Sequence, residues 1–362
     1  MKNIQTSKEI KRREALKKIG AGILAFTAIP HMDISASVTN MTETLPQRMP
    51  DSEWSQIRGF NYQPSYGSKG FELWHNFDAK TIATELERGK RFFPRINALR
   101  WWQSWDAFLR NPKQYVRDFE TTLTLADNIG CRVIPCLFNR WHNNSLDYGG
   151  IYIDHFLSNG STRIFDEFLK ALIVPFHNDQ RILAWDICNE PLGYSCSHDP
   201  VPNIVKSEME WLTNIYNTCK GFGAQAPLSV DTWACITFDM INPISDLFTI
   251  HPYYTSNTKA EKKAFKDYLD KSVAFALKVG KPLLVTECCW GSLDDKVRVE
   301  FIRYSLKEIK KRNLGWLAYL LHHSLIADAH RPEFGFVGIP GNLAFIEADG
   351  TLRPGHEVFN EF

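Results

Sequence analysis

The chain has 362 residues, of which 44% are hydrophobic and 23% charged, which is typical of a folded protein with a large apolar core. Residues 1–36 hold seven of the 42 basic and three of the 41 acidic residues, so the remainder has 35 against 38 and a net charge of −3. A mildly acidic protein without basic runs is a poor candidate for binding nucleic acid or an anionic membrane.

Residues 1–36 have the layout of an export signal peptide. A basic segment containing Arg12 and Arg13 precedes the apolar stretch "AGILAFTAIP", and small residues follow it. The apolar stretch is too short to span a bilayer. The paired arginines resemble a twin-arginine signal, and an ordinary basic signal head is the alternative. We predict cleavage near Ala36, a periplasmic or secreted protein, and no membrane insertion after the signal is removed.

After a polar stretch at 37–55, which we interpret as a linker or N-terminal arm, segments typical of strands and of helices alternate. The expected strands are 56–62, 95–102, 131–138, 182–188, 226–232, 246–252, 281–287 and 314–321. The expected helices are 78–92, 112–130, 162–176, 206–222, 259–280 and 295–313.

Eight strands alternating with helices over 56–362 favour one α/β domain, a single (β/α)8 TIM barrel. The alternative is a doubly wound open sheet. That fold usually carries a G-x-G-x-x-G turn after its first strand, and "GFNYQPSYGSKG" lacks this spacing. The barrel is therefore the better prediction.

Two predicted strands end in a glutamate. Glu190 follows the apolar run "ILAWDIC" and precedes Pro191, which cannot continue a strand, and Glu287 ends "KPLLVTE". In such barrels the functional groups lie at the C-terminal ends of the strands. Retaining cleavage of a glycosidic bond needs two carboxylates about 5–5.5 Å apart. For either glutamate alone, a solvated or salt-bridged loop residue is an equally good interpretation.

The strand ends carry motifs that resemble those of the clan A retaining glycoside hydrolases, the group that includes the family 5 cellulases and mannanases. The motifs are "NEP" at 189–191, "VTE" at 285–287, "HPYY" at 251–254 and "NALRWW" at 97–102. The resemblance implies these roles: Glu190 as acid/base, Glu287 as nucleophile, Asn189 on the sugar 2-hydroxyl, His251 and Tyr253 as the clan's H-x-Y residues, and Arg100 as support for the nucleophile.

Each implied role has a chemical reason. A nucleophilic carboxylate must stay ionised, which a cation such as Arg100 and a hydroxyl such as Tyr253 would favour. The acid must start protonated, so we expect a raised pKa for Glu190 from apolar surroundings or a nearby negative charge. Once Glu287 carries the sugar, Glu190 can serve as the base toward water.

Further side chains at strand tips are candidates for contact with sugar. Tryptophan faces suit the C–H faces of pyranose rings, and amides and hydroxyls can bind the sugar hydroxyls. The candidates are Asn61, Tyr62, Trp101, Trp102, Asn139, Trp233 and Trp290. Structural packing is the alternative for each of them.

We predict no metal and no cofactor. The eleven histidines form neither H-x-H after the first strand nor H-E-x-x-H. The eight cysteines form no C-x-x-C pair, and we expect mostly buried thiols. The expected partner is a carbohydrate substrate, and the expected state is a monomer.

Two positions depart from the family 5 pattern. The third strand ends in Phe138-Asn139 where that family has a histidine, and His142 lies slightly beyond. The eighth strand lacks a tryptophan near its end and reads "LLHHS", so His322 or His323 is a candidate replacement or else a loop residue. The leading hypothesis is a secreted retaining β-glycosidase. A noncatalytic carbohydrate-binding barrel and a metal-dependent barrel hydrolase are the alternatives.

Overall fold

A computed structural model describes residues 47–139, 162–192, 202–326, 330–331, 335–336 and 343–362. The chain divides into two units, residues 1–45 and residues 46–362. The predicted signal peptide falls outside the described residues, and all that follows concerns the second unit. No helix in these described ranges is long and apolar enough to cross a membrane.

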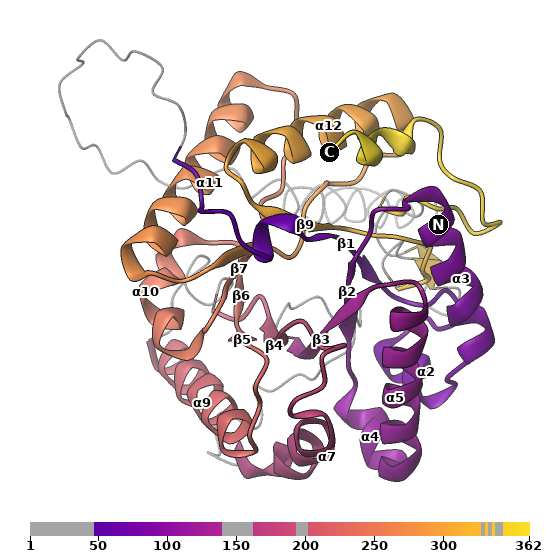
Figure 1. Cartoon of the computed structure of the whole chain (residues 1–362), viewed down its shortest axis with the longest axis vertical. Coiled ribbons are helices and arrows are strands. Elements are labelled where there is room, and N and C mark those ends of the chain that lie inside the picture. The colour runs from indigo at the N-terminus through magenta and orange to yellow at the C-terminus, as the bar shows by residue number, and fades with distance from the viewer. Residues whose placement is uncertain (1–46, 140–161, 193–201, 327–329, 332–334, 337–342) are drawn as a thin grey trace, which may run out of the picture. The chain divides into compact units, whose positions relative to one another are not determined.

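Nine short parallel strands form one sheet, in the order β5-β4-β3-β2-β1-β9-β8-β7-β6. Their bounds are β1 Arg58–Tyr62, β2 Ala98–Trp102, β3 Arg132–Asn139, β4 Trp185–Asn189, β5 Leu228–Ser229, β6 Asp231–Thr232, β7 Phe248–Ile250, β8 Leu283–Val285 and β9 Gly315–Ala318. Strands β5 and β6 stand at the two ends of this order, yet only Val230 separates them in the chain. They occupy one barrel position between them, so the sheet closes into the predicted eight-position (β/α)8 barrel (Figure 1).

Helices surround the strands in Figure 1. Their bounds are α2 Gly70–His75, α3 Ala79–Phe92, α4 Trp105–Arg110, α5 Pro112–Asn128, α7 Asp166–Phe176, α9 Pro202–Gly221, α10 Phe238–Ile241, α11 Lys259–Val279 and α12 Asp295–Lys311. All six predicted helices are present. The connection from β6 to β7 carries only the short α10 between two 3-10 turns. A small antiparallel pair, β10 His330–Arg331 and β11 Gly335–Phe336, lies outside the barrel sheet.

The helix ends follow the sequence signals. The Asp78 carboxylate accepts from the backbone N–H groups of Lys80 and Thr81 and begins α3. Asn111 caps α5, and Pro112 occupies its first turn, where a missing N–H costs nothing. Gly280 ends α11 with φ 67°, a left-handed conformation that glycine adopts without strain.

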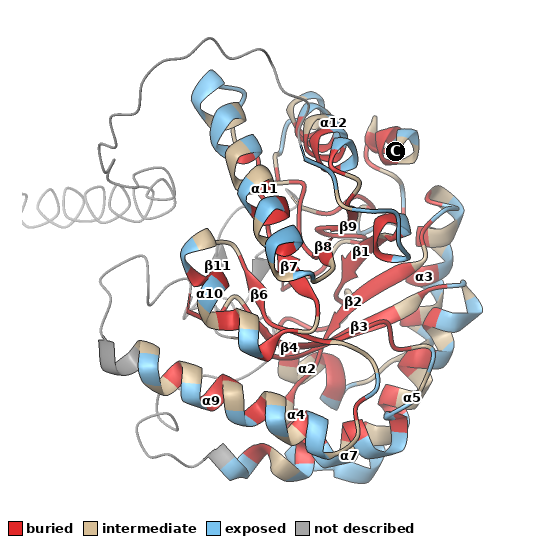
Figure 2. Ribbon diagram, turned by 60° about the vertical axis from the view of Figure 1, so that its left-hand side comes forward, coloured by how far each residue is buried: buried red, intermediate tan, exposed pale blue. Residues whose placement is uncertain are grey.

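The core has an inner and an outer part. Strand residues alternate across the sheet, so Leu99 and Trp101 face the helices while Arg100 and Trp102 face the barrel interior. Figure 2 shows the strands buried throughout and the helices buried on their inner faces. The buried cluster Trp54, Ile57, Ala98, Ile134, Leu183, Ala184, Leu247, Leu284 and Leu317 fills the interior away from the strands' C-terminal ends. Trp54 belongs to the segment interpreted as a linker, so the compact domain begins before residue 56.

Candidate active site

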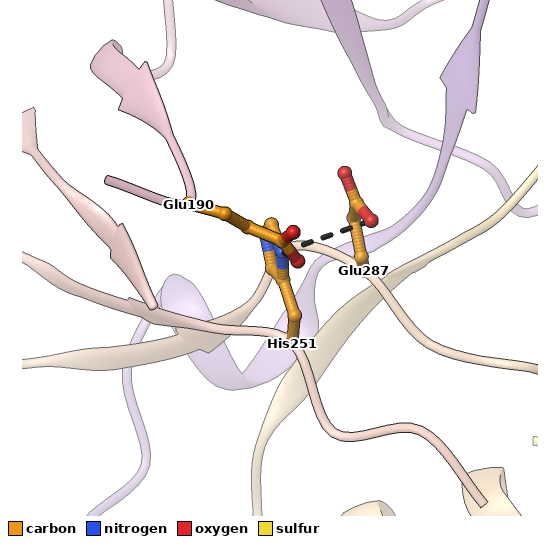
Figure 3. Close-up of side chains that lie close together, drawn as sticks. All are labelled: Glu190, His251 and Glu287. Atoms are coloured by element: carbon orange, nitrogen blue, oxygen red, sulfur yellow. Dashed lines mark hydrogen bonds and ion pairs between the residues drawn. The ribbon is translucent and has the colours of Figure 1, made fainter. Parts of the chain in front are cut away.

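The two predicted catalytic glutamates meet at the mouth of the barrel. Glu190 directly follows β4, and Glu287 lies two residues beyond β8. One carboxylate oxygen of each, together with Nδ1 of His251, lies within 4.8 Å of the others. Figure 3 shows the two carboxyl groups approaching from different strands, with the imidazole ring beside them. The sheet therefore brings together side chains that are 97 positions apart in the sequence.

Both oxygens of Glu287 are held by hydrogen-bond donors. Arg100 Nη1 lies 2.6 Å from Glu287 Oε1, and the Tyr253 hydroxyl donates to Oε2 at 2.6 Å. Glu287 is buried. A guanidinium and a phenol directed at the same carboxylate stabilise its ionised form, as a nucleophile requires.

Glu190 has a different environment. His251 Nδ1 lies 2.6 Å from Glu190 Oε1. Burial raises the pKa of Glu190, the hydrogen bond and charge of His251 partly oppose this, and the neighbouring Glu287 raises it further. The net direction is upward, as expected for a carboxyl group that must start protonated.

His251 also has a strongly shifted pKa. Burial alone would lower it, but the charges of Glu287 and Asp231 raise the pKa of His251 to about 10. The ring is therefore an imidazolium at neutral pH. Its Nε2 lies 3.2 Å from Asp231 Oδ2, and its Nδ1 lies 3.7 Å from Glu287 Oε2.

The structure adds two buried carboxylates that the sequence analysis missed, Asp186 on β4 and Asp231 on β6. Their Oδ2 atoms lie 2.7 Å and 2.6 Å from the same nitrogen, Nη2 of Arg100. Both side chains are fully buried. The available signal was an aspartate within a strand predicted to be buried. Because a buried charge needs a partner, such an aspartate indicates a nearby cation.

Within this cluster the two aspartates differ in charge. Burial and the neighbouring Asp231 raise the pKa of Asp186 well above its usual range. Asp231 is also buried, but the charges of Arg100 and His251 lower its pKa. For Arg100, burial acts downward and is outweighed by the surrounding anions, which raise its pKa. Within the pair, Asp231 is therefore the carboxylate that carries the charge, and Asp186 is the one that burial favours in its neutral form.

Asparagine side chains anchor Arg100. Asn61 accepts from Arg100 Nη1 at 2.9 Å and donates to the backbone oxygen of Thr286 at 2.7 Å, which joins β1 to the segment carrying Glu287. Asn189 accepts from Arg100 Nη2 at 2.8 Å and donates to Asn139 Oδ1 at 3.0 Å. Asn61 is fully buried. The structure therefore shows Asn61 as a support for the Arg100 guanidinium.

Backbone strain is concentrated beside the two glutamates. Glu190, Leu192 and Cys289 have φ of 48°, 64° and 72°, in the left-handed region that non-glycine residues rarely occupy. Such conformations persist where surrounding contacts hold them, and they are common at functional sites.

Of the aromatic residues predicted to contact sugar, Trp102, Trp233 and Trp290 lie on the side of the barrel mouth, whereas Tyr62 and Trp101 face the surrounding helices. Trp102 lies in the barrel mouth with Cys136, and its ring is 5.1 Å from the Arg100 guanidinium carbon. The Trp290 ring packs against Tyr253 with centroids 5.2 Å apart. Trp233 follows β6 directly and is half-buried.

Tyr62 and Trp101 are corrections to the predicted sugar contacts. The Tyr62 hydroxyl donates to Glu85 on α3 at 2.6 Å, and its ring packs edge-on against Trp101. Trp101 also contacts Trp74 of α2. Both face the surrounding helices because strand side chains alternate, and a strand-tip position did not reveal which face they take.

His322 is not placed at the barrel mouth. It is buried, with Nδ1 3.7 Å from Glu85 Oε1 and Nε2 3.4 Å from Arg88, both on α3. Tyr319, directly after β9, lies instead in the cluster with Trp102. His323 is half-buried beside this segment, and His142 lies outside the described residues.

A buried arginine organises the loops beside the site. Arg298 of α12 donates to the backbone oxygens of Cys289 and Trp290, to that of Tyr319 at 2.8 Å and to that of Leu343 at 2.7 Å. It thereby ties the loops that follow β8 and β9 to one another. No sequence motif pointed to this role.

The described cysteines are free, and all except the half-buried Cys235 are buried. The prediction of mostly buried thiols is confirmed for this part of the chain. Cys288 and Cys289 directly follow Glu287, with their sulfur atoms 3.6 Å apart.

The spacing of Glu190, His251 and Glu287 would also suit a metal ion. The electrostatics argue against that use. The oxygens of Glu287 already accept from Arg100 and Tyr253, and Nδ1 of the His251 imidazolium is directed at Glu190. A metal cation would have to displace these donors and sit beside two positive charges. The donor set fits a pair of reacting carboxyl groups better.

The model for cellulases (glycosyl hydrolase family 5) matches residues 53–324. The chain belongs to glycosyl hydrolase family 5. The match covers β1 to β9 and includes both glutamates. This is the family whose motifs the strand ends resemble. The chain spans only about half to three fifths of the length of the first structures it matches. No match was found among curated protein sequences.

Solved structures share the fold at low sequence identity. An exo-β-1,4-mannosidase from Opitutaceae bacterium strain TAV5 has a TM-score of 0.64 and 17% identity, over 84% of this chain and 58% of that one. A family 5 mannosidase from Rhizomucor miehei has 0.60 and 14%, over 84% and 91%. An endo-1,4-β-D-mannanase from Thermotoga petrophila RKU-1 has 0.60 and 15%, over 84% and 98%. At these identities the likeness concerns the fold alone.

Proposed function

We propose that this family 5 hydrolase is an exported retaining β-glycosidase that cleaves an oligo- or polysaccharide by double displacement. Glu190 is the acid/base, and Glu287 is the nucleophile. The observation that carries the proposal is the pair of strand-end carboxylates with oxygens within 4.8 Å, one held by two donors and the other with a raised pKa. Such closeness fits retention, because an inverting pair needs about 6.5–9.5 Å for a water molecule.

In the first step Glu190 protonates the glycosidic oxygen while Glu287 attacks the anomeric carbon. The C–O bond to the leaving group breaks, a covalent glycosyl ester forms on Glu287, and the proton leaves with the departing alcohol. Arg100 and Tyr253 orient the attacking carboxylate. Trp102, Trp233 and Trp290 are the aromatic candidates for contact with the sugar rings.

In the second step Glu190 takes a proton from water, which attacks the same carbon from the side that the leaving group vacated. The ester C–O bond to Glu287 breaks, and Glu287 departs as a carboxylate. Esterification removes the negative charge of Glu287, one of the causes that raise the pKa of Glu190. The Glu190 carboxylate is then the favoured form beside His251. One residue therefore acts first as an acid and then as a base.

A neutral β-linked glucan or mannan is the substrate class we propose. The family model that matches is named for cellulases, and structures with this fold include mannosidases and a mannanase. Residues 140–161 and most of 327–342 lie outside the described residues.

Export is proposed from residues 1–36 alone. Changing Arg12 and Arg13 together to lysine should retain the protein in the cytoplasm if a twin-arginine system exports it. Unchanged fractionation of that variant would favour an ordinary signal peptide.

The catalytic proposal is tested with activated 2-deoxy-2-fluoro glycosides of gluco, manno, galacto and xylo configuration. Intact mass should increase by one fluorosugar, and peptide mapping should place it on Glu287. Glu287→Gln should remain folded and unlabelled. Sugar binding by folded wild-type protein, without turnover or adduct, would support the noncatalytic carbohydrate-binding barrel instead.

A further inference from the structure

Asp231 contacts both Arg100, which holds Glu287, and His251, which holds Glu190. Its Oδ2 is 2.6 Å from Arg100 Nη2 and 3.2 Å from His251 Nε2. Its Oδ1 accepts from the Thr286 hydroxyl at 3.0 Å, which fixes the carboxylate from the segment preceding Glu287. The side chain is fully buried.

Each of these two contacts continues to one glutamate. Arg100 Nη1 reaches Glu287 Oε1 at 2.6 Å, and His251 Nδ1 reaches Glu190 Oε1 at 2.6 Å. Asp231 is thus connected to the proposed nucleophile through Arg100 and to the proposed acid through His251. None of the family motifs found in the sequence includes Asp231.

We propose that Asp231 is a positioning residue that couples the two halves of the site, binding Arg100 toward Glu287 and the imidazolium of His251 toward Glu190. This inference rests on the proposed function. Asp231 does not touch the reacting atoms. It acts by keeping a positive charge on His251.

Several other groups lie around His251. Glu190 follows β4, Glu287 follows β8, and Tyr253 donates to Glu287 beside them. From α11, the Tyr268 hydroxyl donates to the backbone oxygen of Thr232 at 2.9 Å. Among these, Asp231 is the carboxylate that faces the Nε2 side of the ring, while the glutamates face Nδ1.

A charged His251 serves both steps of the reaction. Its Nδ1–H occupies Glu190 Oε1, so the transferable proton resides on Oε2. When Glu287 becomes an ester, the imidazolium still stabilises the Glu190 carboxylate and favours the base form. A neutral ring would lose the second effect, because an uncharged imidazole stabilises a carboxylate far less.

The chain offers a matched control for the test. Asp186 binds the same Arg100 nitrogen at 2.7 Å and is equally buried, but it has no contact with His251 among the described interactions. Asp231→Asn and Asp186→Asn therefore each change one of the two carboxyl groups that contact Arg100 Nη2. A shift in the His251 titration or in the pH profile that occurs in Asp231→Asn and not in Asp186→Asn reports the contact between Asp231 and His251.

The first readout is the protonation state of His251. It is measured by ¹⁵N NMR of the labelled full-length protein across pH 5–10, and His251→Gln serves to assign the signal. We expect wild type and Asp186→Asn to keep a charged ring through pH 8, and Asp231→Asn to have a neutral ring by pH 7. A wild-type ring that is neutral at pH 7 overturns the proposal. So does an equal shift in the two variants, or no shift in Asp231→Asn.

The second readout is the pH profile of kcat/KM on an aryl β-glycoside. The basic limb should move to higher pH in Asp231→Asn, by about 0.5–1 unit, because Glu190 loses the neighbouring cation that favours its ionised form. It should not move in Asp186→Asn. An unmoved limb in Asp231→Asn overturns the proposal.

Two provisions keep the test decisive. If Asp231→Asn does not fold, Thr286→Val takes its place by removing the hydroxyl bound to Asp231 Oδ1. An unchanged His251 titration in Thr286→Val then overturns the proposal. Failure of the proposed function would appear separately, as wild-type protein that forms no adduct on Glu287, whereas the NMR titration does not depend on turnover.

Discussion

The hydroxyl of Tyr253 donates to Oε2 of Glu287 at 2.6 Å, so the carboxylate proposed as nucleophile is held on the side opposite Arg100. The two donors fix the rotation of the carboxylate as well as its charge. Tyr253 comes from the loop after β7, and Glu287 from the loop after β8.

Replacing Tyr253 by phenylalanine removes this donor and keeps the ring that packs on Trp290. We expect kcat to fall about 10- to 100-fold, because a hydrogen bond to a charged group is worth about 1.5–3 kcal/mol. KM should change little, and the unfolding free energy should fall by a similar amount because the same hydrogen bond stabilises the folded protein. Steady-state kinetics on an aryl glycoside and urea unfolding check this, and an unchanged kcat would contradict the assigned contact.

His251 should make stability depend on alkaline pH. Its pKa of about 10 in the folded protein exceeds the ordinary value of 6.5. A raised pKa means that folding is favoured by proton binding, so this contribution is full below pH 6.5 and is lost as pH rises toward 10. Urea unfolding of wild type and His251→Gln at pH 6, 8 and 10 should show a stability difference that shrinks with pH. A constant difference would argue against the charged ring.

Arg298→Met keeps the apolar stem and removes the donors that tie the loops after β8 and β9. We expect a loss of about 2–4 kcal/mol in unfolding free energy, since several buried carbonyls lose their partner. KM should rise as the Trp290 and Tyr319 segments loosen. Arg303 on the same helix pairs with Glu361 and is half exposed, so Arg303→Met should cost under about 1 kcal/mol. Equal losses in the two variants would contradict the role of Arg298.

Thiol reactivity tests the burial of the cysteines. In a Cys196→Ser background, which removes the cysteine outside the described residues, Ellman's reagent at pH 8 should label only Cys235, and slowly. Burial raises the pKa of Cys235 to about 11, and the other thiols are buried. Adding Cys235→Ser should abolish native-state labelling. Rapid labelling of further thiols would show that the barrel opens more readily than its packing implies.

The sequence predicted the barrel well because strand, turn and helix signals alternate regularly. The expected strand 226–232 is interrupted at Val230, and the α/β unit after it has only a short helix, Phe238–Ile241. Neither difference changes the fold, because the sheet still closes through the two halves of that strand.

The site was predicted where a residue's chemistry and its strand-end position were sufficient, as for Glu190 and Glu287. Position alone failed for Tyr62 and Trp101, because the face on which a side chain lies depends on the barrel's alternation. It also failed for Asp186 and Asp231, which lie inside strands and are recognisable only through their shared partner Arg100. Residue roles at the site remain predictions for the experiments above.

The hydrogen bonds around Glu287 have a consequence for folding. Asn61 reaches Thr286 across 225 sequence positions, and Arg100 reaches Glu287 across 187. Contacts of such separation form only when the ends of the chain have been brought together, and closing long loops slows folding. We therefore expect the contacts around Glu287 to form late in folding. During refolding from urea, recovery of catalysis should lag behind recovery of helical signal, so activity reports completed barrel closure.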